Sequence, residues 1–417
     1  MDLHQRTIVL LCRVRRVRNS HKPFAQSLIP SSPTALLSMC PRPRQKVARL
    51  SLRVGCSPEP DGSTPCCPGD HQRLGIDYDE VYSPVVNSTT LRTMLAVAAV
   101  HDYELDTMDA VTAFLNAPLD EVLFLRIPDG FEQKPGMVLR LKKSLYGLKQ
   151  APRHWNSMLH NWLLSKGLQQ CAIDPCLYFI PDSLWVAFWV DDFVVMAKGV
   201  QVKDKFKREI CSAFKMRDMG PIDTFLGMKV KRDRVKRVLT LQSTAHIDQM
   251  LDRFGMLDAK ISLTPLPHKC CLMEAADGDE LLPANTPYRA LVGSLLYVAT
   301  WTRPDIMFAV SQVARFQSKP TTVHWHATKD ILRYLKGTRE LGLTYSAVQG
   351  GSVPRGYVDA SCAEDLNTRK SQTGYALLVG NAAVSWISKL QDSVASQRPS
   401  TLRWQRLSVE HLVCAIC

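Results

Sequence analysis

The chain has 417 residues, enough for two or three domains with buried cores, and its hydrophobic content of 46% is ordinary for a globular protein. No apolar run approaches the roughly 20 residues that cross a bilayer, so a membrane protein is not expected. The net charge is +13, but residues 1–58 contribute +10 of it and residues 389–417 contribute +2. The 330 residues between them carry only +1, so the charge alone does not indicate a polyanionic partner.

The thirteen cysteines do not have the spacing of a disulfide framework. The one CxxC pattern, Cys414 to Cys417, has no second pair to complete a zinc site. We therefore expect reduced thiols in an intracellular protein, with a cytoplasmic particle and the nucleus both open as locations.

The N-terminal segment differs in composition from the rest of the chain. Its first 45 residues are rich in Arg, Ser and Pro and hold one acid, a composition typical of a transit peptide. A segment without selected structure is the alternative. The stretch "GCSPEPDGSTPCCPGD", residues 55–70, is typical of a loop or a disordered linker. We expect irregular structure over residues 1–70.

Folded patterning begins near residue 76. Ser88 or Thr89 as the N-cap, followed by apolar residues at helical spacing, predicts a helix near 89–101. The stretch "YELDTMDAVTAFLN" then predicts a strand with Asp109 at its tip, running into a tight turn and a short helix. The stretches "LFLRIPDGF" and "VLRLKKSLYGL" are strand-like.

Two helices and a hairpin are predicted farther along the chain. "APRHWNSMLHNWLLSKG" is amphipathic, with Pro152 in its first turn and Gly167 at the position after its C-cap. Residues 202–216 predict a helix with a basic outer face, and residues 224–242 predict a hairpin.

Between these helices lies "SLWVAFWVDDFVVMAKG", whose short apolar flanks predict two strands with Asp191 and Asp192 at the turn. Asp-Asp is unfavourable there, because two-residue loops prefer Asn-Gly or Asp-Gly and neighbouring like charges resist desolvation. If Asp109 lies beside this turn, the three carboxylates can hold two Mg²⁺ ions about 3.5–4 Å apart, which activates a 3′-hydroxyl and stabilises a leaving pyrophosphate. An exposed acidic turn without a metal is the alternative.

Six blocks in order resemble the reverse transcriptase of Ty1/copia-type retrotransposon polyproteins. The resemblance extends over residues 75–345, and the blocks are "GIDYDEVYSPVVNSTTLR", "MDAVTAFLNAPLDE", "LKKSLYGLKQAPRHWN", "WVDDFVV", "FLGMKV" and "YRALVGSLLYVATWTRPDI". The resemblance implies an α+β fold, a right-hand polymerase with an antiparallel sheet. It assigns residues 71–245 to fingers and palm, 246–345 to a helical thumb or connection, and 346–395 to a partial ribonuclease H-like fold. Residues 396–417 form a tail without a family match.

The same resemblance implies an RNA-directed DNA polymerase that uses two-metal nucleotidyl transfer. Its cofactor would be Mg²⁺, with Mn²⁺ as an alternative, and its partners an RNA template, the RNA/DNA hybrid, deoxynucleoside triphosphates and other parts of the polyprotein. Two alternatives stay open: a catalytically inactive retroelement remnant, and a coopted nucleic-acid-binding protein.

Individual site residues follow only from matching these blocks. Asp109, Asp191 and Asp192 match the catalytic metal ligands. The backbone from Ala110 to Phe114 would lie along the triphosphate, and the Phe114 ring would exclude a 2′-hydroxyl. The other matched residues are Gln150 at the nucleotide, Arg153 as a phosphate contact, and the primer grip of Phe225, Leu226, Gly227 and Met228. The alternatives are a core phenylalanine at Phe114, a surface charge at Arg153 and a buried strand pair at the grip.

The chain departs from the family pattern at several places. Trp189 replaces the usual Tyr before the acid pair, which puts primer positioning in doubt, and Ala117 replaces a usual Gly. Only "QKVARL" resembles the basic fingers segment, so the fingers residues that bind phosphate are not assigned and the N-terminal segment is interpreted as read out of the ancestral frame.

The C-terminal part resembles the start of the ribonuclease H domain. "RGYVD", "GYALLVG" and "AVSWIS" predict a three-stranded meander, and Asp359 matches the first metal ligand. Ser361 replaces the second acid, and after Val394, where the family has a helix with a catalytic Glu, no Glu follows until Glu410. A ribonuclease H site needs several carboxylates to hold two metals, so we expect this activity to be lost.

Overall fold

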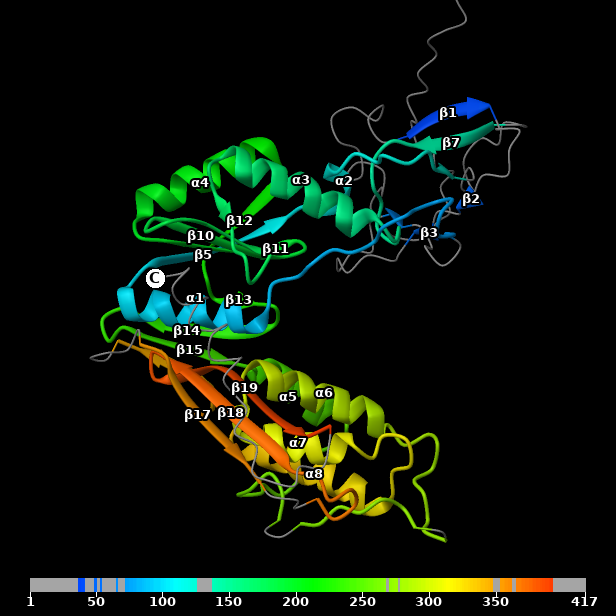
Figure 1. Cartoon of the computed structure of the whole chain (residues 1–417), viewed down its shortest axis with the longest axis vertical. Coiled ribbons are helices and arrows are strands. Elements are labelled where there is room, and N and C mark those ends of the chain that lie inside the picture. Colours follow the sequence, from blue (N-terminus) through cyan, green and yellow to red (C-terminus); the bar gives the residue numbers. More distant parts are fainter. Residues whose placement is uncertain are drawn as a thin grey trace, which may run out of the picture.

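The computed structural model describes residues 72–125, 137–267, 270–276, 278–347, 353–361 and 365–392, together with the backbone of four short strands before residue 72. Helices combine with largely antiparallel sheets, which is characteristic of an α+β fold (Figure 1). Within these residues no helix is both long and apolar enough to cross a membrane.

A six-stranded sheet forms the centre, and all of its strands are antiparallel. Its order is β12 (Met216–Pro221), β5 (Glu104–Ala110), β11 (Asp192–Ala197), β10 (Leu184–Trp189), β9 (Leu177–Ile180) and β8 (Gln169–Gln170). Helices α3 (Ala151–Ser165) and α4 (Val200–Ala213) cover one face, and α1 (Ser88–His101) lies against the other (Figure 1).

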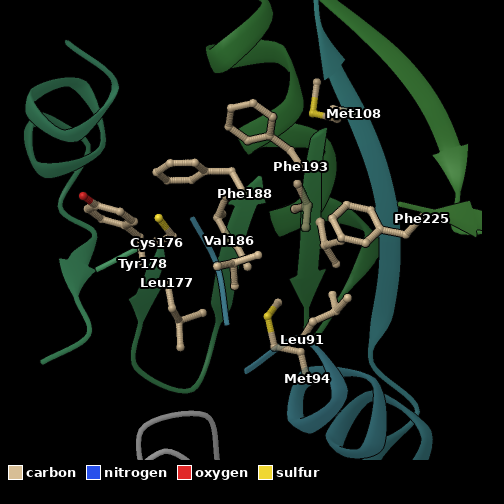
Figure 2. Packing of buried hydrophobic residues seen from close by; sticks show 14 of the residues in the cluster. Leu91, Met94, Met108, Cys176, Leu177, Tyr178, Val186, Phe188, Phe193 and Phe225 are labelled. Atoms are coloured by element: carbon tan, nitrogen blue, oxygen red, sulfur yellow. The ribbon is translucent and has the colours of Figure 1, made fainter. Parts of the chain in front are cut away.

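Burial on both faces explains the apolar flanks of the acid pair. Phe188 stacks near Tyr178, which contacts His160 of α3. On the other face of β10, Trp185 stacks on Tyr103 with ring centroids 5.4 Å apart. Figure 2 shows side chains of α1, β10 and β11 gathered in one cluster. Strands buried on both faces are apolar throughout instead of alternating.

Two local predictions are corrected by tertiary contacts. Helix α1 begins as predicted, but its N-cap is Asn87, whose side chain accepts from the Thr89 N–H at 2.9 Å. Asn caps a helix at least as well as Ser or Thr. The predicted basic outer face of α4 is wrong for Lys203 and Lys207, which are buried and donate to the two carboxylate oxygens of Asp106 on β5.

Helix α3 agrees with its prediction: it has Pro152 in its first turn and Gly167, at φ +81°, directly after the C-cap Lys166. The strand to Asp109 is β5, and it leads through a turn into the short helix α2 (Ala113–Asn116), also as predicted.

A smaller sheet lies on the N-terminal side, in the order β1 (Leu37–Pro41), β7 (Met137–Leu141), β6 (Phe124–Leu125) and β2 (Arg49–Leu50). Strand β3 (Arg53–Val54) pairs with β4 (Pro65–Cys66). Irregular structure over residues 1–70 is therefore corrected for these strands: β1 pairs with β7 over five residues, because an open strand edge accepts a partner. The rest of that segment and residues 396–417 lie outside the described residues.

The predicted hairpin at residues 224–242 is part of another four-stranded sheet. Its order is β13 (Thr224–Phe225), β14 (Met228–Asp233), β15 (Val238–Gln242) and β16 (Leu343–Ser346). Helices then dominate, as expected for residues 246–345. They are α5 (Thr244–Arg253), α6 (Tyr288–Trp301), the short 3₁₀ helix η3 (Pro304–Ile306), α7 (Met307–Ala314) and α8 (Thr322–Gly337), and they enclose a second hydrophobic core.

The predicted C-terminal meander is present as β17 (Arg355–Ala360), β18 (Gln372–Val379) and β19 (Ala382–Leu390), paired in that order. It does not pack as a separate unit. Leu377 and Val384 belong to the hydrophobic core of the central sheet. Arg92 of α1 donates to the Val384 carbonyl at 2.7 Å, and its guanidinium lies 4.0 Å from the centroid of the Trp386 ring.

Candidate active site

The site is built around one cross-strand pair of acids. Asp109 on β5 lies directly opposite Asp192 on β11. The Ala110 N–H donates to the Asp191 carbonyl at 2.8 Å, which makes Asp109 and Asp192 a non-hydrogen-bonded pair. Side chains of such a pair share a face of the sheet, with Cβ atoms about 4.5–5.5 Å apart. The prediction is that Asp109, Asp191 and Asp192 cluster at adjacent strand ends, and the register brings Asp109 and Asp192 together in this way.

The electrostatics of this pair are unfavourable without a counter-charge. Burial, and then the facing carboxylate of Asp109, raise the pKa of Asp192 above its ordinary value. On its other side Asp109 faces Arg217 of β12, at 3.7 Å between Nη1 and Oδ2. Arg217 is 61% exposed, so solvent screens much of this attraction.

The turn before Asp192 differs from the predicted Asp-Asp loop. Because Trp189 pairs with Asp192, the two loop residues are Val190 and Asp191, and Asp192 already belongs to β11. Val190 has φ +54°, which is strained for a β-branched residue. The indole N–H of Trp155, a residue only 1% exposed, donates to the Val190 carbonyl at 2.9 Å and holds this conformation.

Asp191 is positioned by a residue that the sequence did not single out. The Tyr146 hydroxyl donates to Asp191 Oδ2 at 3.1 Å. The Tyr146 ring also packs on Phe114, with centroids 4.5 Å apart. Tyr146 therefore connects an acid of the turn to the proposed sugar-selecting ring. Its place in the matched block "SLYGLKQ" was the available signal, but the contact depends on how two distant segments pack.

Whether these residues suit a metal can be judged from their donor chemistry. Within the described ranges, no group of three or more His, Cys, Asp or Glu side chains is arranged to hold a metal ion. The structure thus brings together two of the three predicted ligands, Asp109 and Asp192, while Asp191 is bonded to Tyr146. Two partly buried carboxylates that face each other suit a hard divalent cation.

The residues predicted at the nucleotide separate into two groups. Phe114 packs on Tyr146, whose hydroxyl donates to Asp191, and the Phe114 side chain is 9% exposed. The Ala110 N–H is already bonded to Asp191, and the Val111 N–H donates to the Lys215 carbonyl at 2.9 Å, so these two groups are engaged within the sheet.

Gln150 and Arg153 have other partners. Gln150 is 0% exposed, accepts from Gln72 Nε2 at 2.9 Å and donates to the Asp77 carbonyl at 3.0 Å. Its observed role is to attach the segment at 72–77 to the start of α3, which replaces the predicted nucleotide contact. Arg153 forms an exposed ion pair with Glu80 at 2.9 Å.

The predicted primer grip is a tight hairpin. Phe225 pairs with Met228, and both side chains are buried, as the alternative of a buried strand pair requires. Leu226 and Gly227 form the loop, with φ +48° and +76°. Positive φ at both loop residues is the type I′ pattern, which matches the twist of the flanking strands.

Asp359 stands apart from this site. It lies on β17, is exposed, faces Gly374 on β18, and accepts the N–H of Ala360 through its own Oδ1. No metal-holding group of acids includes it among the residues that the structure describes.

The chain resembles known proteins over most of its length. The family model of the reverse transcriptase (RNA-dependent DNA polymerase) matches residues 65–268. The Pol polyprotein from transposon TNT 1-94 of Nicotiana tabacum is 41% identical over 341 residues, 78% of this chain and 25% of that protein. A putative transposon Ty5-1 protein of Saccharomyces cerevisiae is 34% identical over 287 residues, 68% of this chain and 92% of that protein.

Coverage limits what these relatives say about the whole protein. The Pol polyprotein from transposon RE2 of Arabidopsis thaliana is 34% identical over 331 residues, 78% of this chain, and this chain spans only 22% of that protein. A solved structure of the foamy viral protease-reverse transcriptase in complex with an RNA/DNA hybrid superposes with a TM-score of 0.49 and 10% identity. The superposition covers 92% of this chain and 45% of the foamy viral chain.

Proposed function

Since the chain belongs to the family of Ty1/copia-type retrotransposon reverse transcriptases, we propose that it acts as an RNA-directed DNA polymerase on an RNA template and a DNA primer. The observation that carries this proposal is the directly paired Asp109 and Asp192 at adjacent strand ends. The central sheet with α3 and α4 corresponds to the palm.

In this proposal Asp109 and Asp192 hold divalent cations, with Asp191 as the third ligand. Mg²⁺ or Mn²⁺ ions held by these carboxylates would supply the charge that activates the primer 3′-hydroxyl and stabilises the leaving pyrophosphate. Tyr146 orients the Asp191 carboxylate through its hydrogen bond. The same ring supports Phe114, which leaves no room for a ribose 2′-hydroxyl and thereby favours deoxynucleoside triphosphates.

The primer end is held by the hairpin of Phe225–Met228, whose buried strand ends leave the Leu226–Gly227 loop at the tip. Other parts of a retroelement polyprotein are proposed as partners. An intracellular location is supported by the described cysteines, which are all free thiols: Cys171, Cys176, Cys211, Cys270 and Cys271.

A second candidate is binding of the RNA/DNA hybrid without turnover. It is favoured by one observation: among the described residues, no three acidic side chains are arranged together as a metal site. Both candidates share the fold and the hybrid, and they differ only in whether the acids complete the site when cations and substrates are present.

Single-nucleotide incorporation on an RNA template separates the two. We expect purified protein to extend a DNA primer with Mg²⁺ or Mn²⁺, to stop when the cation is chelated, and to lose extension in Asp191→Asn, because a neutral amide binds a divalent cation more weakly than a carboxylate. Hybrid binding without any extension by the wild type would select the second candidate. Equal extension by wild type and Asp191→Asn would contradict the assigned site.

A further inference from the structure

We propose that helix α6 is a positioning element of the site, which fixes the spacing between the acid turn (Trp189–Asp192) and the grip turn (Phe225–Met228). This rests on the proposed function, since the two turns hold the acids and the primer end. Helix α6 begins the matched block "YRALVGSLLYVATWTRPDI", whose residues take no part in the chemistry assigned so far.

The contact to the grip turn is made by Tyr297. Its hydroxyl donates to the Leu226 carbonyl at 2.7 Å. Leu226 has φ +48°, a left-handed conformation that is unfavourable for a non-glycine residue and therefore needs support from its surroundings. Burial raises the pKa of Tyr297, so its hydroxyl stays protonated and available as a donor. The Tyr297 ring is itself held against His246 of α5, with centroids 4.7 Å apart.

The contact to the acid turn is made one helical turn later, by Trp301. Residues four apart lie on one face of a helix, so Tyr297 and Trp301 face the same way. The Trp301 ring meets the edge of Trp189, with centroids 6.0 Å apart. Trp189 pairs with Asp192 across the hairpin, so a single face of α6 contacts both turns.

The end of α6 that carries these residues is anchored from two sides. The carbonyls of Thr300 and Trp301 accept from Arg92 Nη1 of α1 at 2.7 and 3.2 Å. Just beyond the helix, Arg303 is 2% exposed, pairs with Asp305 and donates to the Thr338 carbonyl after α8 at 2.9 Å. A helix end held by α1 and by α8 cannot shift freely, so it transmits a fixed spacing to the turns.

The expected consequence is catalytic and not only structural. A loosened grip turn misplaces the primer 3′-hydroxyl relative to the acids, and a misplacement of about 1 Å can lower a rate by roughly 100-fold. The triphosphate is not held by this turn. Loss of the Tyr297 hydroxyl should therefore lower the maximal rate of incorporation and leave the triphosphate KM nearly unchanged.

Tyr297→Phe removes only the hydroxyl, and the chain offers a matched control. Tyr288 lies on the same helix, is buried, and donates to the Val313 carbonyl, also at 2.7 Å, but touches neither turn. Both variants lose one tyrosine hydroxyl bonded to a backbone carbonyl, so any general loss of stability is shared and is checked by thermal unfolding.

The test uses two readouts on the full chain. One is the rate of single-nucleotide incorporation, and the other is the fluorescence of 2-aminopurine at the 3′-end of a dideoxy-terminated primer on an RNA template, which needs no catalysis. We expect Tyr297→Phe to lower the rate about tenfold and to change the fluorescence, while Tyr288→Phe changes neither.

Equal behaviour of the two variants, or wild-type values for Tyr297→Phe in both readouts, would overturn the proposal. If the wild type binds the hybrid but incorporates nothing, the polymerase assignment fails. The fluorescence of the two variants then still decides whether α6 positions the primer end.

Discussion

The central sheet and the C-terminal meander each present an aspartate on a strand that the resemblance assigns to metal binding. In the central sheet, Asp109 faces Asp192 across the ladder, and Arg217 flanks it on the other side. In the meander, Asp359 faces Gly374 and is exposed. The residue opposite on the neighbouring strand, and not the aspartate itself, is what distinguishes the two places.

The contacts around the two aspartates also differ between the two regions. The acid turn of the central sheet is strained at Val190 and held by Trp155. In the meander, tertiary bonds attach the strands to the helices, such as Arg92 of α1 to the Val384 carbonyl and the Trp386 indole N–H to the Ala299 carbonyl of α6. One edge of the central sheet thus positions acids, whereas the described part of the meander is attached to the core through bonds that do not involve Asp359.

The largest expected effect comes from exchanging an acid in each region. Asp109→Asn should lower Mg²⁺-dependent incorporation by at least about 100-fold, because even outer-shell partners of a metal contribute 10–100-fold. Asp359→Asn should leave incorporation unchanged, and the RNA strand of the hybrid should stay intact in the wild type. If the wild type cleaves that RNA and Asp359→Asn does not, the meander also holds a working acid and the two regions do not differ in this respect.

The attachment of the meander gives the next effect. Arg92→Met leaves the carbonyl of the buried Val384 without its donor and also removes the bond to the Thr300 carbonyl, so it should lower the free energy of unfolding by about 2–4 kcal/mol. Because Leu377 and Val384 lie in the core of the central sheet, the meander should unfold in the same urea transition as that sheet. Two separate transitions, with Arg92→Met affecting only one, would show that the meander is an independent unit.

A substitution of Gln150 tests whether this residue belongs to the nucleotide site or only stabilises the fold. Gln150→Ala removes a buried amide from Gln72 and from the Asp77 carbonyl and should lower the free energy of unfolding by about 1–3 kcal/mol. The triphosphate KM should stay unchanged at temperatures where the variant is folded. As a comparison, Arg153→Ala breaks only an exposed ion pair and should change stability by less than about 1 kcal/mol. A raised triphosphate KM in Gln150→Ala would instead support the predicted contact between Gln150 and the nucleotide.

The smallest effect is a pH dependence in the meander. Burial raises the pKa of Asp365, but bonds from Arg315 and Thr368 outweigh it and hold the pKa at about 2. Because the pKa of Asp365 is lower in the folded state than in the unfolded state, its ionised carboxylate stabilises the fold at pH values above the ordinary aspartate pKa. This contribution is lost as the pH falls toward 2. Asp365→Asn should therefore cost about 1–2 kcal/mol at pH 7, a difference that shrinks on acidification. A cost that is independent of pH would contradict the ion pair.

Local signals were sufficient for the elements and for the position of the acids. Proline in the first turn and glycine after the cap placed α3, and apolar runs placed the strands on either side of the acid pair. Short strands with acids at their ends make neighbouring carboxylates a natural expectation, and Asp109 does pair with Asp192.

Features that depend on a distant partner could not be predicted in this way. Lys203 and Lys207 face inward because Asp106 lies beneath α4. The Arg217 contact depends on the register of β12, which is irregular between Asp218 and Gly220. Gln150 is buried because a segment more than seventy residues earlier crosses the start of α3. None of these partners leaves a pattern in the neighbouring sequence.

Cation binding tests most directly the claim that the cross-strand acid pair makes the site. Mn²⁺ titration by calorimetry at pH 7 compares the wild type with Asp192→Asn and Asp359→Asn, without template or nucleotide. The account predicts that Asp192→Asn weakens Mn²⁺ binding at least about tenfold and that Asp359→Asn retains the wild-type affinity. Unchanged binding in Asp192→Asn, or a loss confined to Asp359→Asn, would contradict it.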